Sequence, residues 1–303
     1  MSDTIYQSCR LCPRQCGADR TVGGSGFCGQ SARLFAARAA LHYWEEPCIS
    51  GERPGGSGTV FFSGCTLRCA YCQNAEISRG EAGRELSAER LADIFLELEQ
   101  KGAYNVNLVT PTHYLPHLLA AIPDARKRGL TVPIVYNTSG YERPELLRRL
   151  EGLVDVWLPD FKYKSAELSE KYSAAPDYFE WALAALDEML RQAGPPRFDG
   201  RGMMTRGVIV RHLVLPGHTD DSRAVVQTLW ERYGDSIWLS LMNQYTPMPG
   251  VAERFPELSR RLLPKEYESV VDFAAELGIE QAFVQEGGTA EESFIPPFDY
   301  EGL

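Results

Sequence analysis

Residues 61–74 read "FFSGCTLRCAYCQN" and place Cys65, Cys69 and Cys72 directly after a short apolar run. Three thiols are one fewer than a closed tetrahedral zinc site requires, and open zinc sites more often use histidine and carboxylate. A [4Fe-4S] cluster held by three cysteines leaves one iron without a protein ligand. The spacing therefore predicts an iron-sulfur cluster with an open coordination position, and the alternative is a loop stapled by zinc.

From residue 59 onward the chain alternates apolar runs with helical patterns. Such runs are expected of parallel strands covered on both faces, and they lie at 59–63, 103–109, 132–137, 153–158, 207–215 and 236–242. Helices are predicted at 87–101 with Ser87 as cap, from Pro144, at 220–234 and from residue 264. The alternation predicts right-handed βαβ units in an α/β fold. Periodicity does not decide between a doubly wound sheet and part of a (β/α) barrel.

In both architectures the chemistry gathers at the carboxyl ends of the strands. The cysteine trio follows the first predicted strand. Each later strand is followed by a polar segment: "TPTHY" (110–114), "TSGYE" (138–142), "PDFKYK" (159–164), "PGHTDD" (216–221) and "NQYTPM" (243–248). We expect these segments to surround one site.

Charge and hydropathy patterns restrict the partners. The 303 residues carry a net charge of -10, which argues against a nucleic-acid partner. The start "MSDTIYQSCRLC" lacks the pattern of a signal peptide, and no apolar run approaches the length of a membrane span. The sequence predicts a cytoplasmic protein, where clustered cysteines are more often metal ligands or catalytic thiols than disulfides.

A second cysteine group lies in residues 1–58, which we interpret as a metal-binding segment preceding the main domain at 59–303. Cys9, Cys12, Cys16 and Cys28 offer four thiolates, which fit either an auxiliary [4Fe-4S] cluster or Zn²⁺. The run 32–44 is compatible with a strand pair or a hairpin arm. Cys48 stands alone and is expected to be a small buried apolar residue. The tail 293–303 is expected to lie across the body of the protein.

The C-x3-C-x2-C spacing, with Tyr71 before the last cysteine, resembles the signature of the radical S-adenosylmethionine (SAM) superfamily. The resemblance implies a partial (β/α)6 barrel and a [4Fe-4S] cluster whose open iron chelates SAM. It also implies reductive cleavage of SAM to methionine and a 5′-deoxyadenosyl radical, which takes a hydrogen atom from the substrate.

Other segments resemble the activating enzymes of glycyl-radical enzymes, such as the pyruvate formate-lyase activating enzyme. "LPDFKYK" is similar to an Asp-x-Lys element near SAM, "VRHLVLPGHTDD" to a segment whose arginine binds the SAM carboxylate, and "YNTSGYE" to a third-strand end. These roles agree with the charges, because a carboxylate can bind the SAM ammonium group and a guanidinium can bind the SAM carboxylate. The residues that this resemblance assigns to cofactor binding are Asp160, Lys162, Arg211, Asn137, Thr138 and Ser139.

The sequence also departs from that family. Its Gly-Gly-Glu element is replaced by "VTPTHY", so Thr110, Thr112 or His113 is expected to supply the contacts to the SAM amino group. Gln244 and Tyr245 stand at the sixth strand end, where a histidine would be expected, and we count them as candidate cofactor contacts.

The resemblance to this branch extends over almost the whole chain, including the N-terminal cysteines. It implies flavodoxin or ferredoxin as electron donor and a glycine of a glycyl-radical enzyme as substrate. The alternatives are radical modification of a small molecule or peptide and, in another class, a non-catalytic iron-sulfur or zinc protein.

Some titratable residues have less specific patterns. "HYWEEP" carries His42, Glu45 and Glu46, and adjacent side chains of an extended segment point in opposite directions. A solvated charge pair is therefore expected for the two glutamates. His113 follows a predicted strand in a loop facing the cluster and ranks above His117 and His218.

Overall fold

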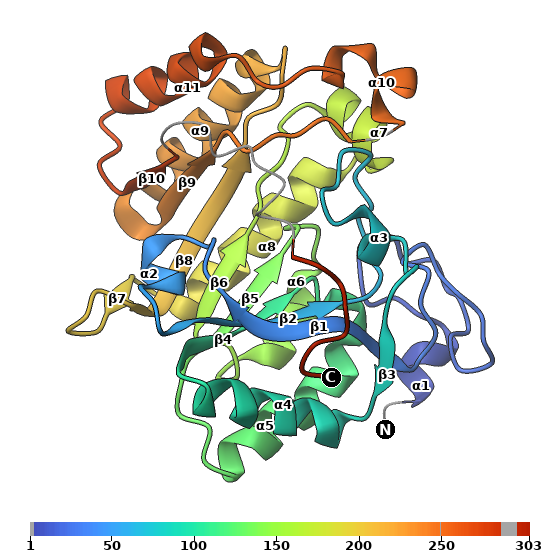
Figure 1. The fold of residues 1–303 in the computed structure, drawn as a ribbon. Helices are drawn as coiled ribbons and strands as arrows, with labels where there is room; N and C mark the ends of the chain where they lie inside the picture. The colour runs from blue at the N-terminus through green and yellow to red at the C-terminus, as the bar shows by residue number, and fades with distance from the viewer. Residues whose placement is uncertain (1–2, 249, 286–295) are drawn as a thin grey trace.

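The computed structural model describes residues 3–248, 250–285 and 296–303. Its centre is a curved, mostly parallel sheet with helices packed on its outer face (Figure 1). The parallel strands are β2 (Gly56–Phe62), β4 (Ala103–Val109), β5 (Ile134–Thr138), β6 (Val156–Pro159), β8 (Met204–Leu213), β9 (Trp238–Met242) and β10 (Ala282–Val284). The antiparallel additions are β1 (Leu34–His42) on β2, β3 (Arg84–Leu86) on β1 and β7 (Arg197–Phe198) on β8.

The order of the strands decides the architecture. From β2 to β10 the spatial order follows the chain order, with β3 and β10 as the two edges. A doubly wound sheet would reverse its order at a switch point, whereas a barrel adds each new strand on the same side. The fold is therefore an open, partial barrel, and the six predicted strands are confirmed. The seventh parallel strand, β10, was not predicted.

The longer helices connect successive parallel strands and cover the outside of the sheet (Figure 1). They are α4 (Ala88–Gln100), α5 (Leu115–Lys127), α8 (Tyr178–Ala193), α9 (Thr219–Tyr233) and α11 (Pro264–Glu276), and the shorter helices are α1 (Asp3–Gln7), α2 (Pro47–Ser50), α3 (Ala75–Ser78), α6 (Pro144–Leu147), α7 (Ala166–Ser173) and α10 (Val251–Arg254). Short 3-10 turns lie at Thr112–Tyr114, Arg148–Leu150, Gly234–Ser236 and Pro256–Leu258. The Ser87 side chain caps α4 by accepting from the Arg90 amide at 3.0 Å, as predicted.

Strand β2 leads directly into the cysteine loop, and its successive side chains point to opposite faces of the sheet. Val60 and Phe62 face the helices and join the main core, while Phe61 faces the barrel interior. The loop then turns at Gly64, whose φ is +84°. A Cβ there would stand 2.8 Å from the Cys28 carbonyl oxygen, so this turn requires glycine and brings the N-terminal segment against the cysteine loop.

Strand β1 joins the N-terminal part of the chain to the sheet. It runs antiparallel to β2, as a hairpin arm would; on its other side its first three residues pair with β3, and Ala37 and Ala39 meet the C-terminal tail. Tyr300 donates its amide to the Ala37 carbonyl at 3.0 Å, Ala39 donates to the Glu301 carbonyl at 2.8 Å, and the Phe298 ring packs against Phe61. Residues 296–303 thus lie across the body as predicted, whereas 293–295 lie outside the described residues. The domain division at residue 58 stays a prediction.

In the part of the chain that the structure describes, no helix combines the length and apolar character that crossing a membrane requires.

Candidate active site

A cavity of about 220 Å³ opens at the carboxyl ends of the strands, and the sulfur-bearing side chains of the trio line it. We call it the cysteine cavity. Most of the residues predicted from separate strand ends meet there. The predicted residues that line it are Cys65, Cys69, Cys72, Thr110, Asn137, Thr138, Ser139, Asp160, Lys162, Arg211 and Gln244.

The cysteine loop presents one sulfur to backbone donors. The amides of Leu67 and Arg68 each point to the Cys65 Sγ at 3.4 Å. Burial raises the pKa of the Cys65 thiol to about 12, and burial together with the Cys69 thiol raises that of Cys72. The thiols of Cys65 and Cys72 are therefore favoured over their thiolates, and forming those two thiolates calls for a cationic metal centre.

The trio fits a cluster better than a single ion. Within residues 3–248, 250–285 and 296–303, no three His, Cys, Asp or Glu side chains are grouped so that they could hold a metal ion. An iron-sulfur cluster makes a different demand, because its thiolates ligate different irons. Three cysteines on one cavity wall, with two N–H donors at the first sulfur, meet that demand.

The ends of β5 and β6 are tied together beside the cysteines. Lys162 Nζ lies 2.6 Å from Asp160 Oδ2. Burial disfavours the lysine charge, but the neighbouring carboxylate raises the pKa of Lys162 above its ordinary value. The Tyr178 hydroxyl accepts from the Lys162 amide at 2.9 Å and lies 2.9 Å from the Ser139 carbonyl oxygen, which fixes this pair against the third-strand end.

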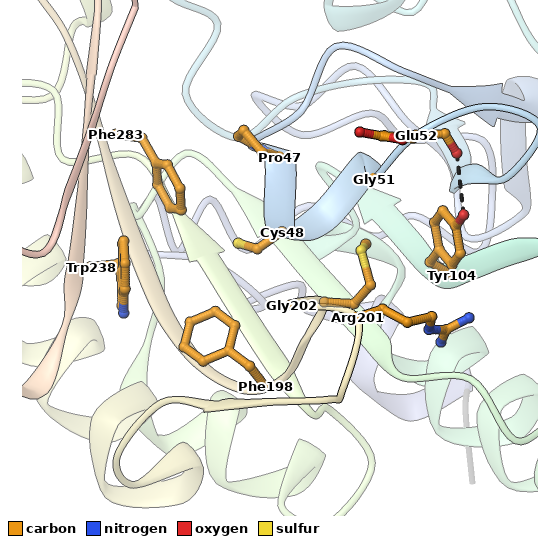
Figure 2. A pocket seen from close by; sticks show the side chains of 11 residues that line it. Pro47, Cys48, Gly51, Glu52, Tyr104, Phe198, Arg201, Gly202, Trp238 and Phe283 are labelled. Carbon is orange, nitrogen blue, oxygen red and sulfur yellow. Dashed lines mark hydrogen bonds between the residues drawn. The ribbon is translucent and has the colours of Figure 1, made fainter.

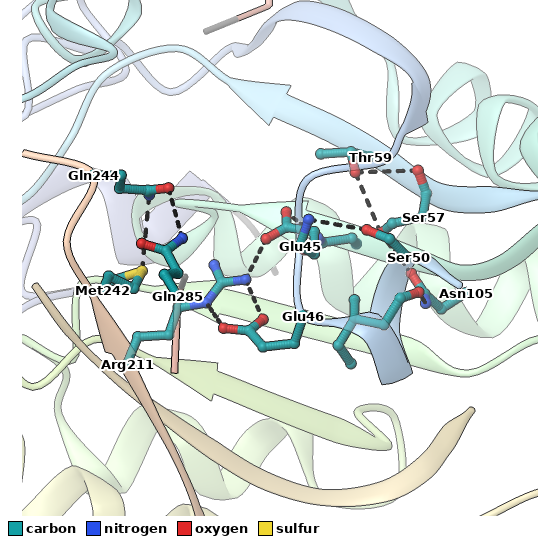
Figure 3. A network of polar contacts seen from close by, with 12 residues as sticks. Glu45, Glu46, Ser50, Ser57, Thr59, Asn105, Arg211, Met242, Gln244 and Gln285 are labelled. Carbon is teal, nitrogen blue, oxygen red and sulfur yellow. Dashed lines mark hydrogen bonds and ion pairs between the residues drawn. The ribbon is translucent and has the colours of Figure 1, made fainter. Parts of the chain in front are cut away.

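At the floor of the cavity Arg211 is held by two carboxylates (Figure 3). Its Nε donates to Glu46 Oε1 at 2.8 Å and its Nη2 to Glu46 Oε2 at 2.5 Å, and Nη2 also donates to Glu45. Arg211 and Glu46 are only 9% and 7% exposed. Burial would raise the pKa of Glu46, but Arg211 lowers it below the ordinary value. Among the described residues, Nη1 is the guanidinium nitrogen that these bonds do not engage.

The prediction of a solvated glutamate pair is therefore wrong. The chain does not stay extended after His42, because Pro47 begins α2 and Glu46 becomes its N-cap residue. The turn is fixed by the Glu45 amide, which donates to Ser50 Oγ at 2.9 Å. Both carboxylates consequently reach the same guanidinium.

Three predicted cofactor contacts lie outside the lining of the cysteine cavity. Thr112 donates to the Glu142 carboxylate at 2.5 Å, and Tyr245 donates to the Leu258 carbonyl at 2.6 Å. His113 is buried against the Ser63 carbonyl at 2.7 Å, and burial lowers its pKa to about 3. His113 therefore supports the residue two positions before Cys65.

Two polar groups were missed from the sequence. Glu142 lies within "TSGYE" and accepts hydrogen bonds from the hydroxyls of Thr112 and Thr138; burial raises its pKa to about 7. Asn107 is fully buried in β4 and donates to Glu45 Oε1 at 2.8 Å. The available signal was a pair of asparagines, Asn105 and Asn107, in a strand whose neighbouring residues are apolar.

The four N-terminal cysteines also come together. Cys9, Cys12 and Cys28 are buried, and Gly26 lies so close to Cys16 that an added Cβ would stand 2.6 Å from its sulfur. Burial raises the pKa of Cys12 to about 12 and also that of Cys28, and the Cys9 thiol adds to both effects.

Arg20 supplies a buried positive charge at this group. It is 1% exposed and its Nη1 lies 3.6 Å from Cys9 Sγ. Burial raises the pKa of the Cys28 thiol more than the Arg20 charge lowers it.

The N-terminal segment also contacts the cysteine loop through hydrogen bonds from Arg14. Arg14 donates from Nε to the Thr66 carbonyl at 3.1 Å and from Nη2 to the Leu67 carbonyl at 3.3 Å. The same Nη2 donates to the Ser173 carbonyl at 2.6 Å, and the guanidinium lies over the Phe27 ring. The two cysteine groups are thus joined through one side chain.

A larger cavity of about 640 Å³ lies at the opposite, amino ends of the strands (Figure 2). Trp238 and Phe283 stack with their ring centroids 4.8 Å apart, and Phe198 meets Trp238 edge-on at 5.6 Å. Cys48 is buried beside this cavity, as predicted for a small apolar residue. The amino end of a barrel is the end whose residues serve stability, and no predicted site residue lines this cavity, so the cysteine cavity is the candidate active site.

Comparison with known proteins assigns the class. The family model of the radical SAM superfamily matches residues 59–229, more than half of the chain. The chain is 27% identical over 289 residues to "Uncharacterized protein MJ0674" of Methanocaldococcus jannaschii, which covers 92% of this chain and 78% of that protein. A 40-residue stretch is 48% identical to the pyruvate formate-lyase-activating enzyme of Clostridium pasteurianum, covering 13% of this chain and 17% of that enzyme.

Solved structures agree on the fold. A radical SAM methyltransferase from Sphaerobacter thermophilus superposes with a TM-score of 0.53 at 15% identity, over 76% of this chain and 66% of the methyltransferase. SuiB of Streptococcus suis, bound to its precursor peptide SuiA, superposes with a TM-score of 0.50 at 13% identity, over 74% of this chain and 46% of SuiB. At these identities the likeness concerns the fold alone.

The chain therefore belongs to the radical SAM superfamily. Membership implies a [4Fe-4S] cluster and SAM as cofactors, and the trio in the cysteine cavity is the donor set that fits the cluster.

Proposed function

We propose that this protein is a cytoplasmic enzyme that cleaves SAM reductively and uses the resulting radical to abstract hydrogen from a glycine of a glycyl-radical enzyme. The observation that carries the radical chemistry is the meeting of Cys65, Cys69 and Cys72 with polar residues from five further strands in one cavity. The substrate assignment is supported by the stretch similar to the activating enzyme of Clostridium pasteurianum.

In this proposal, different side chains of the cavity bind the cluster and different parts of SAM. The trio holds the cluster, which together with SAM supplies the 5′-deoxyadenosyl radical. Asp160 and Lys162 form a fixed ion pair beside the cysteines, and Arg211 offers Nη1 to the SAM carboxylate while its other donors are engaged. Asn137, which is half-buried, and Ser139 line the same cavity, and we assign their polar side chains to the SAM ribose.

The N-terminal cysteines are proposed to hold an auxiliary [4Fe-4S] cluster, with Zn²⁺ as the alternative. Arg14 brings this group against the cysteine loop, a contact suited to passing an electron inward from flavodoxin or ferredoxin. Iron, sulfide and zinc analysis of anaerobically reconstituted protein decides the point, because two clusters imply about eight irons and one cluster about four.

Two assays test the function. Reconstituted protein with SAM and dithionite should form 5′-deoxyadenosine and methionine, and their absence would overturn the radical chemistry. Incubation with candidate glycyl-radical enzymes should give a glycyl doublet in electron paramagnetic resonance. Product formation without a doublet would overturn the glycine assignment and favour a small molecule or peptide as substrate.

A further inference from the structure

Among the described residues, the floor of the cysteine cavity carries one more negative charge than positive charges. Three carboxylates, those of Glu45, Glu46 and Asp160, face two cations, Lys162 and Arg211, which leaves one negative charge in the group. Glu45 and Arg211 both line the cavity, and their side chains are only 8% and 10% exposed. Buried charges in proteins are normally paired, so this floor calls for one more cation.

A second observation points to a hydrogen-bond donor at the same place. Asn107 is fully buried, and its Oδ1 has no hydrogen-bond partner among the described residues. The orientation of its amide is fixed, because Nδ2 must face the Glu45 carboxylate, 2.8 Å away. The unpartnered atom is therefore an acceptor that lies next to the Glu45 carboxylate, so this buried pair presents acceptors and only Glu45 of the two lines the cavity.

The wall of the cavity adds two compatible features. Ser139 lines it, and its buried hydroxyl oxygen likewise has no partner in the described part of the chain. Trp44 borders the opening with half of its surface exposed, and an indole face attracts organic cations. Burial lowers the pKa of His42, which also lines the cavity, so this imidazole does not supply the missing charge near neutral pH.

The position of these groups separates them from the cysteines. Glu45 and Glu46 precede α2, whose residue Ile49 packs with Val135 and Ile209 in the apolar cluster below the cavity. The carboxylates therefore stand where the barrel interior changes from apolar to polar, while the trio belongs to the loop at the carboxyl ends of the strands. The three cysteines, Glu45 and Arg211 nevertheless line the same cavity, and Figure 3 shows the two glutamates around the Arg211 guanidinium.

We propose that Glu45, held by Arg211 and Asn107, binds a positively charged nitrogen of the substrate, an ammonium or guanidinium group. This inference rests on the proposed function, because it places the substrate in the cavity that the cysteine trio shares. Arg211 and Asn107 act as positioning residues, since each fixes one oxygen of the Glu45 carboxylate.

Calorimetric titration of the anaerobically reconstituted protein with n-butylammonium tests this, with n-butanol as the neutral probe of equal length. We expect n-butylammonium to bind with a Kd on the order of 1 mM and n-butanol not to saturate. Glu45→Gln should weaken n-butylammonium binding about tenfold or more, because the hydrogen bond loses its charge assistance. The exposed Glu89→Gln, on the outside of the barrel, should bind as the parent does.

Equal binding of the two probes by the parent protein would overturn the proposal, and this comparison needs no variant. Unchanged binding by a folded Glu45→Gln protein would overturn it as well. The titration with n-butylammonium is repeated in the presence of saturating SAM, because the amino group of SAM could bind the same carboxylate. Unchanged n-butylammonium affinity assigns the subsite to the substrate, whereas competition assigns it to the SAM amino group and overturns the substrate assignment. The titration uses no reductant, so it stays informative even if no 5′-deoxyadenosine is formed.

Discussion

Replacing Arg211 with methionine tests the buried charge group at the cavity floor. The guanidinium is almost fully enclosed and satisfies both Glu45 and Glu46. Methionine keeps much of the length and removes the charge, so two carboxylates stay buried without a cation. Breaking a buried ion pair by removing one partner costs about 3–5 kcal/mol. With an unfolding entropy of about 2.1 cal/mol/K per residue, this corresponds to a Tm lower by roughly 5–8 °C.

The decrease in Tm caused by Arg211→Met should depend on pH, because the carboxylates of Glu45 and Glu46 lose their charge as the pH falls. In the parent protein Arg211 lowers the pKa of Glu46, so its stabilisation is present above the ordinary carboxyl pKa and disappears as the pH falls. In Arg211→Met the buried carboxylates have raised pKa values, so protonation relieves them as the pH falls. The deficit in Tm should therefore be larger at pH 8 than at pH 5.

The assay is thermal unfolding of the reconstituted protein without SAM, followed by circular dichroism. Arg232→Met is the matched control, because Arg232 pairs with Asp187 at 2.6 Å while both side chains are nearly half exposed. Such a pair contributes about 0–1 kcal/mol, so the control should lose less than about 2 °C. Equal losses in the two variants, or a deficit that does not shrink toward pH 5, would refute the reasoning.

Three further predictions concern the surroundings of the cysteines. Arg14→Ala should lower the free energy of unfolding by about 2 kcal/mol relative to the exposed Arg10→Ala, measured by denaturant titration, because it removes charged donors to the cysteine loop. Gly26→Ala should reduce metal bound by the N-terminal cysteines, since its Cβ would meet a cysteine sulfur at 2.6 Å, whereas Gly200→Ala has open space; metal analysis of both checks this. The parent should lose up to about 3 kcal/mol of stability as the pH rises from 5 to 8, because the Glu142 carboxyl, with its pKa raised to about 7, is favoured neutral in the fold. Glu142→Gln should flatten that slope, and an unchanged slope in unfolding curves across this pH range would contradict the assignment.

The sequence predicts much of this fold because the buried strands carry strong local signals. Apolar runs followed by polar segments located β2, β4, β5, β6, β8 and β9, and the cysteine spacing identified the loop after β2. The periodicity did not decide between a doubly wound sheet and a barrel, because the two architectures share the same local pattern. Only the pairing of β2 with β4 and the unbroken order up to β10 distinguish them.

The floor of the site could not be predicted for a related reason. Glu45 and Glu46 enter the cavity because a four-residue helix, α2, turns the chain inward, and a single helical turn has no periodic pattern. Their partner Arg211 lies more than 160 residues away in the sequence, so the ion pair exists only through tertiary contact. His113 and Tyr245 were placed at strand ends as expected, yet their side chains turn into the core, where burial outweighs their polarity.

The most direct test of the central claim compares SAM cleavage by the parent, Cys69→Ala and Cys48→Ala proteins, each reconstituted anaerobically and reduced with dithionite. Cys48 is buried away from the cysteine cavity, so its loss controls for removing a thiol. Cys69 lines the cavity with Cys65 and Cys72. We predict 5′-deoxyadenosine from the parent and Cys48→Ala and none from Cys69→Ala. Equal cleavage by Cys69→Ala and the parent would contradict the account.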